Sequence, residues 1–490
     1  MAQNRVFFAF FLMSVIAVKM AIGCQGHRKN SERPHIILIL ADDLGWSDVG
    51  WRDSAMYTPT LDRLAQEGMI LNDSYMQPTC TPSRAALLTG MYPFRLGLQH
   101  SVLNAGRDNY LSDQYTILPQ YLKRLGYATH MIGKWHLGFC NWKYTPTRRG
   151  FDTFYGYYNG IEGYYNHTGH KDGYDFRDNE EVDWSAKGQY STHLFAARAQ
   201  QILMSHDFFQ PLFLYLSFQA VHGPFEVPDS YIETHCAHVR DADRRMRCGM
   251  IAALDEAVAN VTRTLEEEGY LDNAIILFSS DNGGPTNKAS SNWPLRGSKT
   301  TLWEGGTRSV GFIHSRTHLR KAGRTYSGLV HAVDWLPTLL AAAGSNGSDV
   351  DLPRNIDGMN LWEQIKIGIR SPRLEFVYNI DDVKDNAALR MGRFKLLSGN
   401  PGKPNDWANP PSGARPRAAP KGRVPDVHLF DLDVDPAETR NIADRRPKTV
   451  TNMLQKLEKY KQGVVPTRRG HVMKLSNPRL HNNTWSPGFC

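Results

Sequence analysis

Residues 35–43 have the sequence HIILILADD, in which a nearly continuous apolar run ends in two aspartates. A short run without polar alternation is typical of a strand that is buried on both faces of a parallel sheet. Three further runs share this form and also lead into polar residues: 127–132 before Lys134 and His136, 211–218 before His222, and 274–278 before Asp281 and Asn282. Because helical patterns alternate with these strands, the sequence predicts an α/β fold with a large, mostly parallel central sheet flanked by helices.

Helical periodicity and a change of composition divide the rest of the chain. The expected helices are 61–69, 83–89, 244–268, 334–343 and 449–460. Beyond residue 370, the apolar segments 387–397 and 427–432 predict strands of a second, smaller sheet, and seven prolines lie between them. We therefore expect a large domain over 24–370 and a small α+β domain over 371–490, with an exposed Pro-rich loop at 401–425.

The composition is that of an ordinary globular protein. Of the 490 residues, 41% are hydrophobic and 22% are charged, which excludes a collagen-like, coiled-coil or wholly disordered chain. Lysine and arginine number 57 and aspartate and glutamate 49, so the formal net charge is +8. This excess is mild for the length, and the sequence has no strongly basic block with the pattern of a known nucleic-acid-binding fold. We expect no nucleic-acid partner.

The N-terminus predicts the compartment. Arg5 precedes an apolar run over 6–18, and small residues follow up to Gly23. A run of this length is too short to span a membrane and is typical of a secretory signal, which we place at 1–23. An uncleaved anchor and a lipoprotein cleavage site at Cys24 are the alternatives. We expect no membrane span in the mature protein. Glycosylation sequons fit a protein of the secretory pathway, lysosomal or extracellular, and lie at Asn72, Asn166, Asn260, Asn346 and Asn482.

The cysteine spacing fits no zinc-binding pattern. Cys236 and Cys248 could close a short loop, and Cys140 and Cys490 would then form the remaining pair, although the sequence leaves the connectivity open. With these two pairs formed, Cys80 has no partner.

Oxygen-bearing side chains follow the predicted strands at Asp42, Asp43, Asp281 and Asn282. If the strands are parallel, their carboxyl ends meet in one crevice. One such ending is more often a turn or a helix cap, but four polar endings in one chain favour a site. Oxygen ligands alone suit calcium or magnesium rather than zinc or copper. A divalent ion would leave one excess negative charge on the three aspartates. Cations that could balance this charge, and attract a tetrahedral oxyanion, are Lys134, Lys299 and Arg84. The spacing predicts metal-assisted chemistry on a sulfate or phosphate ester.

Two long segments carry a family resemblance. Residues 78–90, PTCTPSRAALLTG, resemble the sulfatase signature built on C-x-P-S-R, and residues 126–136, GYATHMIGKWH, resemble the second signature of that family. The resemblance covers roughly residues 34 to 465. Segments most similar to the arylsulfatase B group, from which the cysteine positions nevertheless differ, are 133–138, 146–153, 291–297 and 302–306.

The resemblance implies an alkaline-phosphatase-like sandwich whose large domain is catalytic. It also implies that a separate formylglycine-generating enzyme oxidises Cys80 to formylglycine. The hydrated aldehyde would offer one hydroxyl to attack sulfur, while the second would let the covalent sulfate ester expel sulfate and restore the aldehyde. One calcium ion would be held by residue 80 together with Asp42, Asp43, Asp281 and Asn282.

Further roles follow from the same resemblance. Arg84 would hold the hydrated aldehyde, and Lys134 and Lys299 would bind sulfate oxygens. His222 would protonate the leaving alkoxide, and His136 would deprotonate the second hydroxyl. Asp281 would also take the proton of the attacking hydroxyl. Aromatic residues that could stack on sugar rings or simply pack are Tyr164, Tyr165, Trp293 and Trp303, and we expect Glu226 and Asp255 to be structural.

The resemblance therefore predicts a sulfuric ester hydrolase that acts on a sulfated sugar. The first candidate substrate is the N-acetylgalactosamine 4-sulfate unit of a glycosaminoglycan. One alternative is a phosphomonoester or phosphonate hydrolase of the same superfamily, although phosphatase relatives usually use Ser or Thr with two zinc ions. The other alternative is an inactive secreted protein that binds sulfated glycans.

Overall fold

The computed structural model describes residues 33–345, 349–404, 407–411, 414 and 425–490. The expected signal segment, Cys24, the sequon at Asn346 and part of the Pro-rich loop lie outside the described residues.

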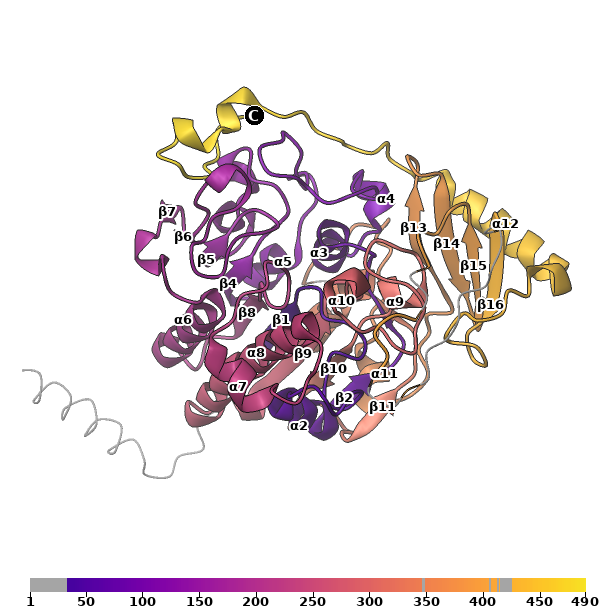
Figure 1. The fold of residues 1–490 in the computed structure, drawn as a ribbon, viewed down its shortest axis with the longest axis horizontal. Coiled ribbons are helices and arrows are strands. Elements are labelled where there is room, and N and C mark those ends of the chain that lie inside the picture. The colour runs from indigo at the N-terminus through magenta and orange to yellow at the C-terminus, as the bar shows by residue number, and fades with distance from the viewer. Residues whose placement is uncertain (1–32, 346–348, 405–406, 412–413, 415–424) are drawn as a thin grey trace, which may run out of the picture.

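A ten-stranded sheet forms the centre of the molecule, in the order β11-β2-β10-β9-β1-β8-β4-β5-β6-β7 (Figure 1). The five consecutive strands β9, β1, β8, β4 and β5 are parallel, which confirms the mostly parallel sheet. The strands are β1 His35–Ala41, β2 Met69–Leu71, β4 Ala128–Lys134, β5 Thr153–Tyr157, β6 Arg177–Asp178, β7 Glu181–Val182, β8 Leu212–Ser217, β9 Ala274–Ser280, β10 Gly311–His314 and β11 Arg324–Tyr326.

Helices cover both faces of this sheet, and β1 shows why the apolar runs lack alternation. Ile36, Leu38 and Leu40 face one core and Ile37 and Ile39 face the other, and all are fully buried. Helices whose buried residues join the first core are α3 Cys80–Thr89, α4 Pro93–Leu96, α5 Leu118–Arg124, α10 Trp335–Ala342, α11 Trp362–Ile367 and α12 Pro447–Lys461. Those of the second core are α2 Pro59–Glu67, α6 Ser191–Ser205, α7 Asp229–His235 and α8 Ala242–Glu267.

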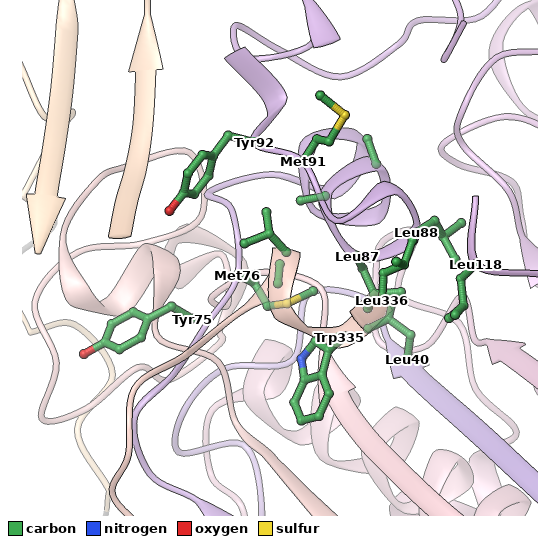
Figure 2. Close-up of a cluster of buried hydrophobic side chains, with 14 of the residues drawn as sticks. Leu40, Tyr75, Met76, Leu87, Leu88, Met91, Tyr92, Leu118, Trp335 and Leu336 are labelled. Carbon is green, nitrogen blue, oxygen red and sulfur yellow. The ribbon is translucent and has the colours of Figure 1, made fainter. Parts of the chain in front are cut away.

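Helix α3 lies inside the first core, and every one of its residues is buried. Figure 2 shows Leu87 and Leu88 of this helix beside Leu40 of β1, Leu118 of α5 and Leu336 of α10. Such close packing on several sides holds the helix rigidly against the sheet. The first residue of α3 is thereby fixed beside the carboxyl end of β1.

A four-stranded antiparallel sheet forms the C-terminal part, in the order β13-β14-β15-β16, with α12 packed on β14 and β15. Its strands are β13 Glu375–Asp381, β14 Asn386–Met391, β15 Phe394–Ser398 and β16 Val427–Asp431. The expected single strand over 387–397 is wrong. Met391 pairs with Phe394 across a two-residue turn, in which Gly392 has a φ of 54°. Apolar residues continue on both sides of that turn, so the pattern concealed it.

The chain end returns to the large sheet after α12 (Figure 1). Thr484 bridges to Tyr174, and the side chains of Trp485 and Phe489 are buried. A disulfide joins Cys490 to Cys140, and a second joins Cys236 to Cys248. Both expected pairings are confirmed, and Cys80 is a free, buried cysteine.

Three short elements complete the fold: β3 Ser74–Tyr75 pairs with β12 Val330–His331, and α9 is Glu304–Thr307. No helix in the described part of the chain is both long enough and apolar enough to cross a bilayer.

Candidate active site

The parallel strands deliver the predicted residues to one edge of the sheet. Asp42 and Asp43 follow β1, and Asp281 and Asn282 follow the neighbouring strand β9. Lys134 is the last residue of β4, two strands from β1 on its other side. Main-chain hydrogen bonds fix these ends, because the Asp281 N–H donates to the Ala41 carbonyl at 3.0 Å and the Asp42 N–H donates to the Ala220 carbonyl at 2.9 Å.

Cys80 lies against the same edge, at the start of α3. One ligand atom each from Asp42, Cys80 and Asp281 lies within 4.8 Å of the other two. Burial raises the pKa of the Cys80 thiol to about 11, although Lys134 and Lys299 oppose the shift. The Thr81 hydroxyl donates to the His136 carbonyl at 3.0 Å and ties the start of α3 to the loop after β4. An unmodified thiol here would be neutral at physiological pH and a weak nucleophile.

Each buried aspartate contacts a cation or an amide. The Lys134 ammonium lies 2.5 Å from Asp42, and the Lys299 ammonium lies 2.6 Å from Asp43. The Asn282 side chain donates to Asp43 at 2.7 Å. Burial alone would raise the pKa of Asp43, but Lys299 and His222 outweigh it and hold that pKa below its ordinary value. Asp43 is therefore ionised in the folded protein.

Arg84 connects α3 to the ends of three strands. Its Nε and one terminal nitrogen donate to the same Asp281 oxygen at 3.1 and 2.8 Å, and the other terminal nitrogen donates to the Lys134 carbonyl at 3.1 Å and to the Ser217 hydroxyl. Burial, followed by the charge of Asp42, raises the pKa of Asp281. Arg84 opposes that shift, so this arginine favours the ionised carboxylate.

The donor set fits a hard divalent cation. Among the described residues, Asp42 Oδ1 and Asn282 Oδ1 are buried oxygens with no hydrogen-bond donor. A buried acceptor without a partner is costly, and a cation would satisfy both atoms. A second cluster of possible ligand atoms, within 4.8 Å of one another, is formed by Asp42, Asp43 and His222. Because most of the possible ligand atoms are oxygens, they favour calcium or magnesium.

The two histidines differ in their environment. His136 is buried, and its Nε2 lies 3.0 Å from the Leu103 carbonyl, which assigns the proton to Nε2 and leaves Nδ1 as a free acceptor. Burial, followed by Lys134 and Arg84, lowers its pKa well below the ordinary value. His222 directs Nδ1 to the Gly223 carbonyl at 2.7 Å and places Nε2 3.6 Å from Asp43. Burial lowers the pKa of His222 to about 4.

Strained backbone positions two of these residues. Asp43 has a φ of 63° and His136 a φ of 56°, in the left-handed region that non-glycine residues seldom adopt. Gly160 lies against the His136 ring, where an added Cβ would come within 2.4 Å of two ring atoms. Such outliers persist where the surrounding packing determines them, and they cluster at functional sites.

Several residues that support the site were not predicted from the sequence. Arg247 of α8 is fully buried and donates to the Asp43 carbonyl and to Asp48. Asn292 accepts from the Gly284 N–H at 2.9 Å and donates to the Gly284 carbonyl at 2.8 Å, which fixes the turn after Asn282. A buried arginine within the apolar pattern of a long helix is the signal that could have identified Arg247.

A cavity of about 830 Å³ opens onto this site, and Asp43, His222 and Lys299 are part of its lining. Lys288 and the sequon residue Asn166 also line the cavity. Tyr164 and Trp303, which could have stacked on a sugar, are instead fully buried. Glu226, which we expected to be structural, accepts from the Tyr164 N–H at 2.6 Å and also lines this cavity.

The fold and the site indicate a hydrolase of the α/β class in which acidic residues, paired with cations, act on an oxyanion ester at the carboxyl edge of a parallel sheet. A family model described as Sulfatase matches residues 34–345, and the chain belongs to the sulfatase family, whose members use a metal ion and formylglycine. It is a sulfatase enzyme.

Relatives agree with this assignment. Arylsulfatase J of Mus musculus is 42% identical over 490 residues, covering 94% of this chain and 81% of the relative. N-acetylgalactosamine-6-sulfatase of Homo sapiens is 31% identical over 392 residues, covering 74% and 71%. The solved structure of Ps i-CgsB in complex with k-i-k-neocarrahexaose is 27% identical, with a TM-score of 0.78 over 92% of this chain and 98% of that one.

Proposed function

We propose that the protein removes sulfate from a sulfated sugar, with the N-acetylgalactosamine 4-sulfate unit of a glycosaminoglycan as the first candidate. The observation that carries the proposal is the convergence of Cys80, Asp42 and Asp281 within 4.8 Å, with Lys134 and Lys299 bound to the neighbouring acids. These residues supply a modifiable side chain, cation ligands and binding groups for an oxyanion at one point.

One group of relatives and one solved structure support a sugar sulfate as the natural substrate. One relative is named for N-acetylgalactosamine 6-sulfate, and the structure of Ps i-CgsB contains a neocarrahexaose. The cavity at the site, of about 830 Å³, has the volume of pockets that hold sugar-sized ligands.

Residues that would hold the calcium ion are Asp42, Asp43, Asp281, Asn282 and the modified residue 80. Bound there, the ion would polarise the sulfate ester and lower the cost of ionising the nucleophile. Residue 80, as hydrated formylglycine, would supply the attacking hydroxyl and a second hydroxyl that allows release of sulfate. A formylglycine-generating enzyme would be the maturation partner.

Lys134 and Lys299 are the cations that would bind the sulfate oxygens. Both are held by the consecutive aspartates Asp42 and Asp43 of the loop after β1, so they are oriented before the substrate arrives. Donors that are oriented in advance stabilise the charge that develops in the transition state without a cost of reorganisation. Arg84, which contacts Asp281, would keep that carboxylate ionised and close to residue 80.

The histidines would carry the protons. His136 has its Nδ1 lone pair free and a pKa well below the ordinary value, so the ring is neutral and can accept the proton of the second hydroxyl. His222, at the cavity wall, would donate a proton from Nε2 to the leaving sugar alkoxide. A bound sulfate ester is negative and would raise the pKa of His222 from about 4 toward the working range.

The compartment that fits these features is the secretory pathway, with the lysosome or the extracellular space as the destination. Two disulfides are present, and such bonds persist in oxidising compartments.

A panel of defined substrates tests the proposed function. N-acetylgalactosamine 4-sulfate and 6-sulfate units at the ends of disaccharides would be compared with a small aryl sulfate, a phosphomonoester and a phosphonate monoester. The proposal predicts sulfate release from the 4-sulfated sugar at the highest kcat/KM. Preference for the phosphorus esters would support the hydrolase alternative, and binding of every sulfated sugar without turnover would support the glycan-binding alternative.

A further inference from the structure

A second large cavity lies between the edge strands of the central sheet and the small C-terminal sheet. Its volume is about 700 Å³, and it shares no lining residue with the cavity at the catalytic site. Loops around the large sheet contribute Trp46, Arg52 and Arg308. The C-terminal sheet and the loop after β16 contribute Arg390, Gly392, Arg393, Leu432, Asp433 and Pro436. We refer to it as the arginine cavity.

The lining of the arginine cavity is strongly cationic. Two aspartates, Asp73 and Asp433, face six arginines: Arg52, Arg308, Arg370, Arg373, Arg390 and Arg393. Ion pairs neutralise three of the six, because Arg308 contacts Asp73 at 2.8 Å, Arg373 contacts the buried Asp334, and Arg393 contacts Asp431 at 2.6 Å. Of the other three, Arg52 and Arg370 carry the excess charge.

Of these remaining arginines, Arg52 and Arg370 have few acidic neighbours. Burial lowers the pKa of Arg390, but Tyr75, Tyr378 and the acids Glu304 and Asp73 outweigh this effect and raise that pKa. Within the described part of the chain, Arg52 and Arg370 form no ion pair, and the only one of Arg390 spans 4.0 Å to the exposed Asp433. Arg390 is 4% exposed, and its Nη1 donates to no acceptor among the described residues. Buried donors without acceptors are rare and costly, so an anionic acceptor bound in the cavity would be favourable.

Arg52 shows the same excess of positive charge. Its guanidinium lies 3.5 Å from the centre of the Trp46 ring, and that of Arg308 lies 4.9 Å from the same ring. The Nε of Arg52 is buried without an acceptor. Burial and the charge of Arg308 lower the pKa of Arg52 to about 9. An anion in the cavity would relieve this repulsion.

We propose that the arginine cavity binds a sulfated saccharide at a site separate from the catalytic one. Guanidinium groups match the geometry of sulfate oxygens, which they bind through paired hydrogen bonds. The cavity exceeds the volume of one free oxyanion and lies within the range of pockets that hold larger ligands. Trp46, Pro294 and Leu295 add an apolar wall for a sugar ring.

The loops that carry this wall also carry the catalytic residues. Trp46 follows Asp43 by three residues, and its N–H donates to Asn292 at 3.3 Å, beside the turn after Asn282. Because the arginine cavity is separate from the catalytic site, a polymer bound in it would stay on the enzyme between turnovers. This inference rests on charge and shape and holds whichever sulfated sugar the catalytic site prefers.

Calorimetric titration of the full-length Cys80→Ala protein tests the proposal without interference from turnover. The probes are a chondroitin 4-sulfate tetrasaccharide, its desulfated counterpart and inorganic sulfate. We expect two tetrasaccharide sites per chain and a single site after Arg52→Gln with Arg370→Gln, or at least a tenfold weaker second site. Arg124→Gln is the matched control, because Arg124 is exposed and also lies over an aromatic ring, that of Tyr121, outside the cavity.

A rate measurement separates this proposal from the proposed function. With Cys80 intact, the double arginine variant should hydrolyse a small aryl sulfate at the unchanged rate. Thermal melting confirms folding, and the exposed Arg370→Gln alone serves if the double variant melts early. The proposal is overturned by equal stoichiometry in the variant and its parent, by inorganic sulfate binding as tightly as the tetrasaccharide, or by a mass spectrum showing that an N-glycan on the cavity residue Asn72 already fills the space.

Discussion

At the scale of single residues, the catalytic edge contains aspartates and cations that neutralise each other in pairs. Asp42 contacts Lys134, Asp43 contacts Lys299 and Asp281 contacts Arg84. All of these partners except the partly exposed Lys299 are fully or almost fully buried, so loss of a partner leaves a buried aspartate charged and desolvated. Residue 80 lies among them with a thiol whose pKa, about 11, makes it unsuited to act unmodified.

Replacement of Cys80 by serine should abolish repeated turnover. A serine ester of sulfate lacks the second hydroxyl through which the aldehyde hydrate would release sulfate. We expect at most one sulfate bound per chain, measured as covalent mass during incubation with an aryl sulfate. Sustained turnover by this variant would contradict the mechanism.

Lys134→Ala should lower kcat with an aryl sulfate by about 10²–10³-fold, because one donor to the developing charge is lost. Lys288→Ala is the control, since Lys288 is an exposed lysine that lines the cavity opening onto the site. Thermal melting should show a much smaller relative change than the rate. A rate loss that merely follows the loss of folded protein would argue against a role in binding sulfate.

The site residues differ in how far the sequence could predict them. Asp42 and Asp281 were predictable because each directly follows a strand whose burial the apolar run reveals. Lys299 lies in a loop without regular structure, so its assignment as a sulfate-binding group depended on the resemblance to the sulfatases. Asn292 accepts from the Trp46 N–H and Gly160 lies against the His136 ring, and these contacts join segments that are apart in the sequence, which no local pattern encodes.

At the scale of elements, helix α2 depends on a carboxylate from α8. Asp255 accepts the N–H groups of Thr60 and Leu61 at 3.0 and 2.7 Å, in the first turn of α2, which has no side-chain cap of its own. An anion at a helix N-terminus is stabilising. Burial nevertheless raises the pKa of Asp255 to about 6.

This shift predicts a pH dependence of stability. Between the unfolded value of 3.8 and about 6, the unfolded chain releases the Asp255 proton before the folded protein does. The contribution of this group to the free energy of unfolding therefore falls as pH rises through that window, by about 3 kcal/mol in all. Asp255→Asn removes the titration, so its melting temperature relative to wild type should rise from pH 4 to pH 6.5. A difference in melting temperature between the two proteins that does not change with pH would contradict the raised pKa of Asp255.

Strands of the central sheet were easier to predict than those of the small sheet. Runs such as 35–41 are apolar on both faces, because helices cover both sides, and their pattern is unambiguous. In the small sheet, a two-residue turn at Gly392 and Arg393 interrupts a similar run and leaves little trace in composition. The turn becomes evident only through the pairing of Ala387 with Ser398 across the hairpin.

At the scale of the whole molecule, the chain end attaches the C-terminal region to the large sheet. The Cys140–Cys490 disulfide closes a sequence separation of 350, whereas Cys236–Cys248 closes one of 12. In the chain-entropy description, a longer closed loop gives a larger restriction of the unfolded state. The packed residues Trp485 and Phe489 add burial at the same attachment.

Removal of the long-range disulfide should therefore cost more than removal of the local one. We expect Cys140→Ser with Cys490→Ser to lower the free energy of unfolding by about 2–5 kcal/mol, and Cys236→Ser with Cys248→Ser to lower it by less. Denaturant titration of both variants measures the difference. An equal or larger loss for the short loop would show that the chain end contributes little to global stability.

The mass of the peptide that carries residue 80 tests the central claim most directly. Protein secreted from a eukaryotic cell and shown to hydrolyse an aryl sulfate would be digested, and that peptide examined by mass spectrometry. The account predicts an aldehyde or its hydrate in place of the thiol, in proportion to the active fraction. An unmodified Cys80 throughout a fully active preparation would contradict it.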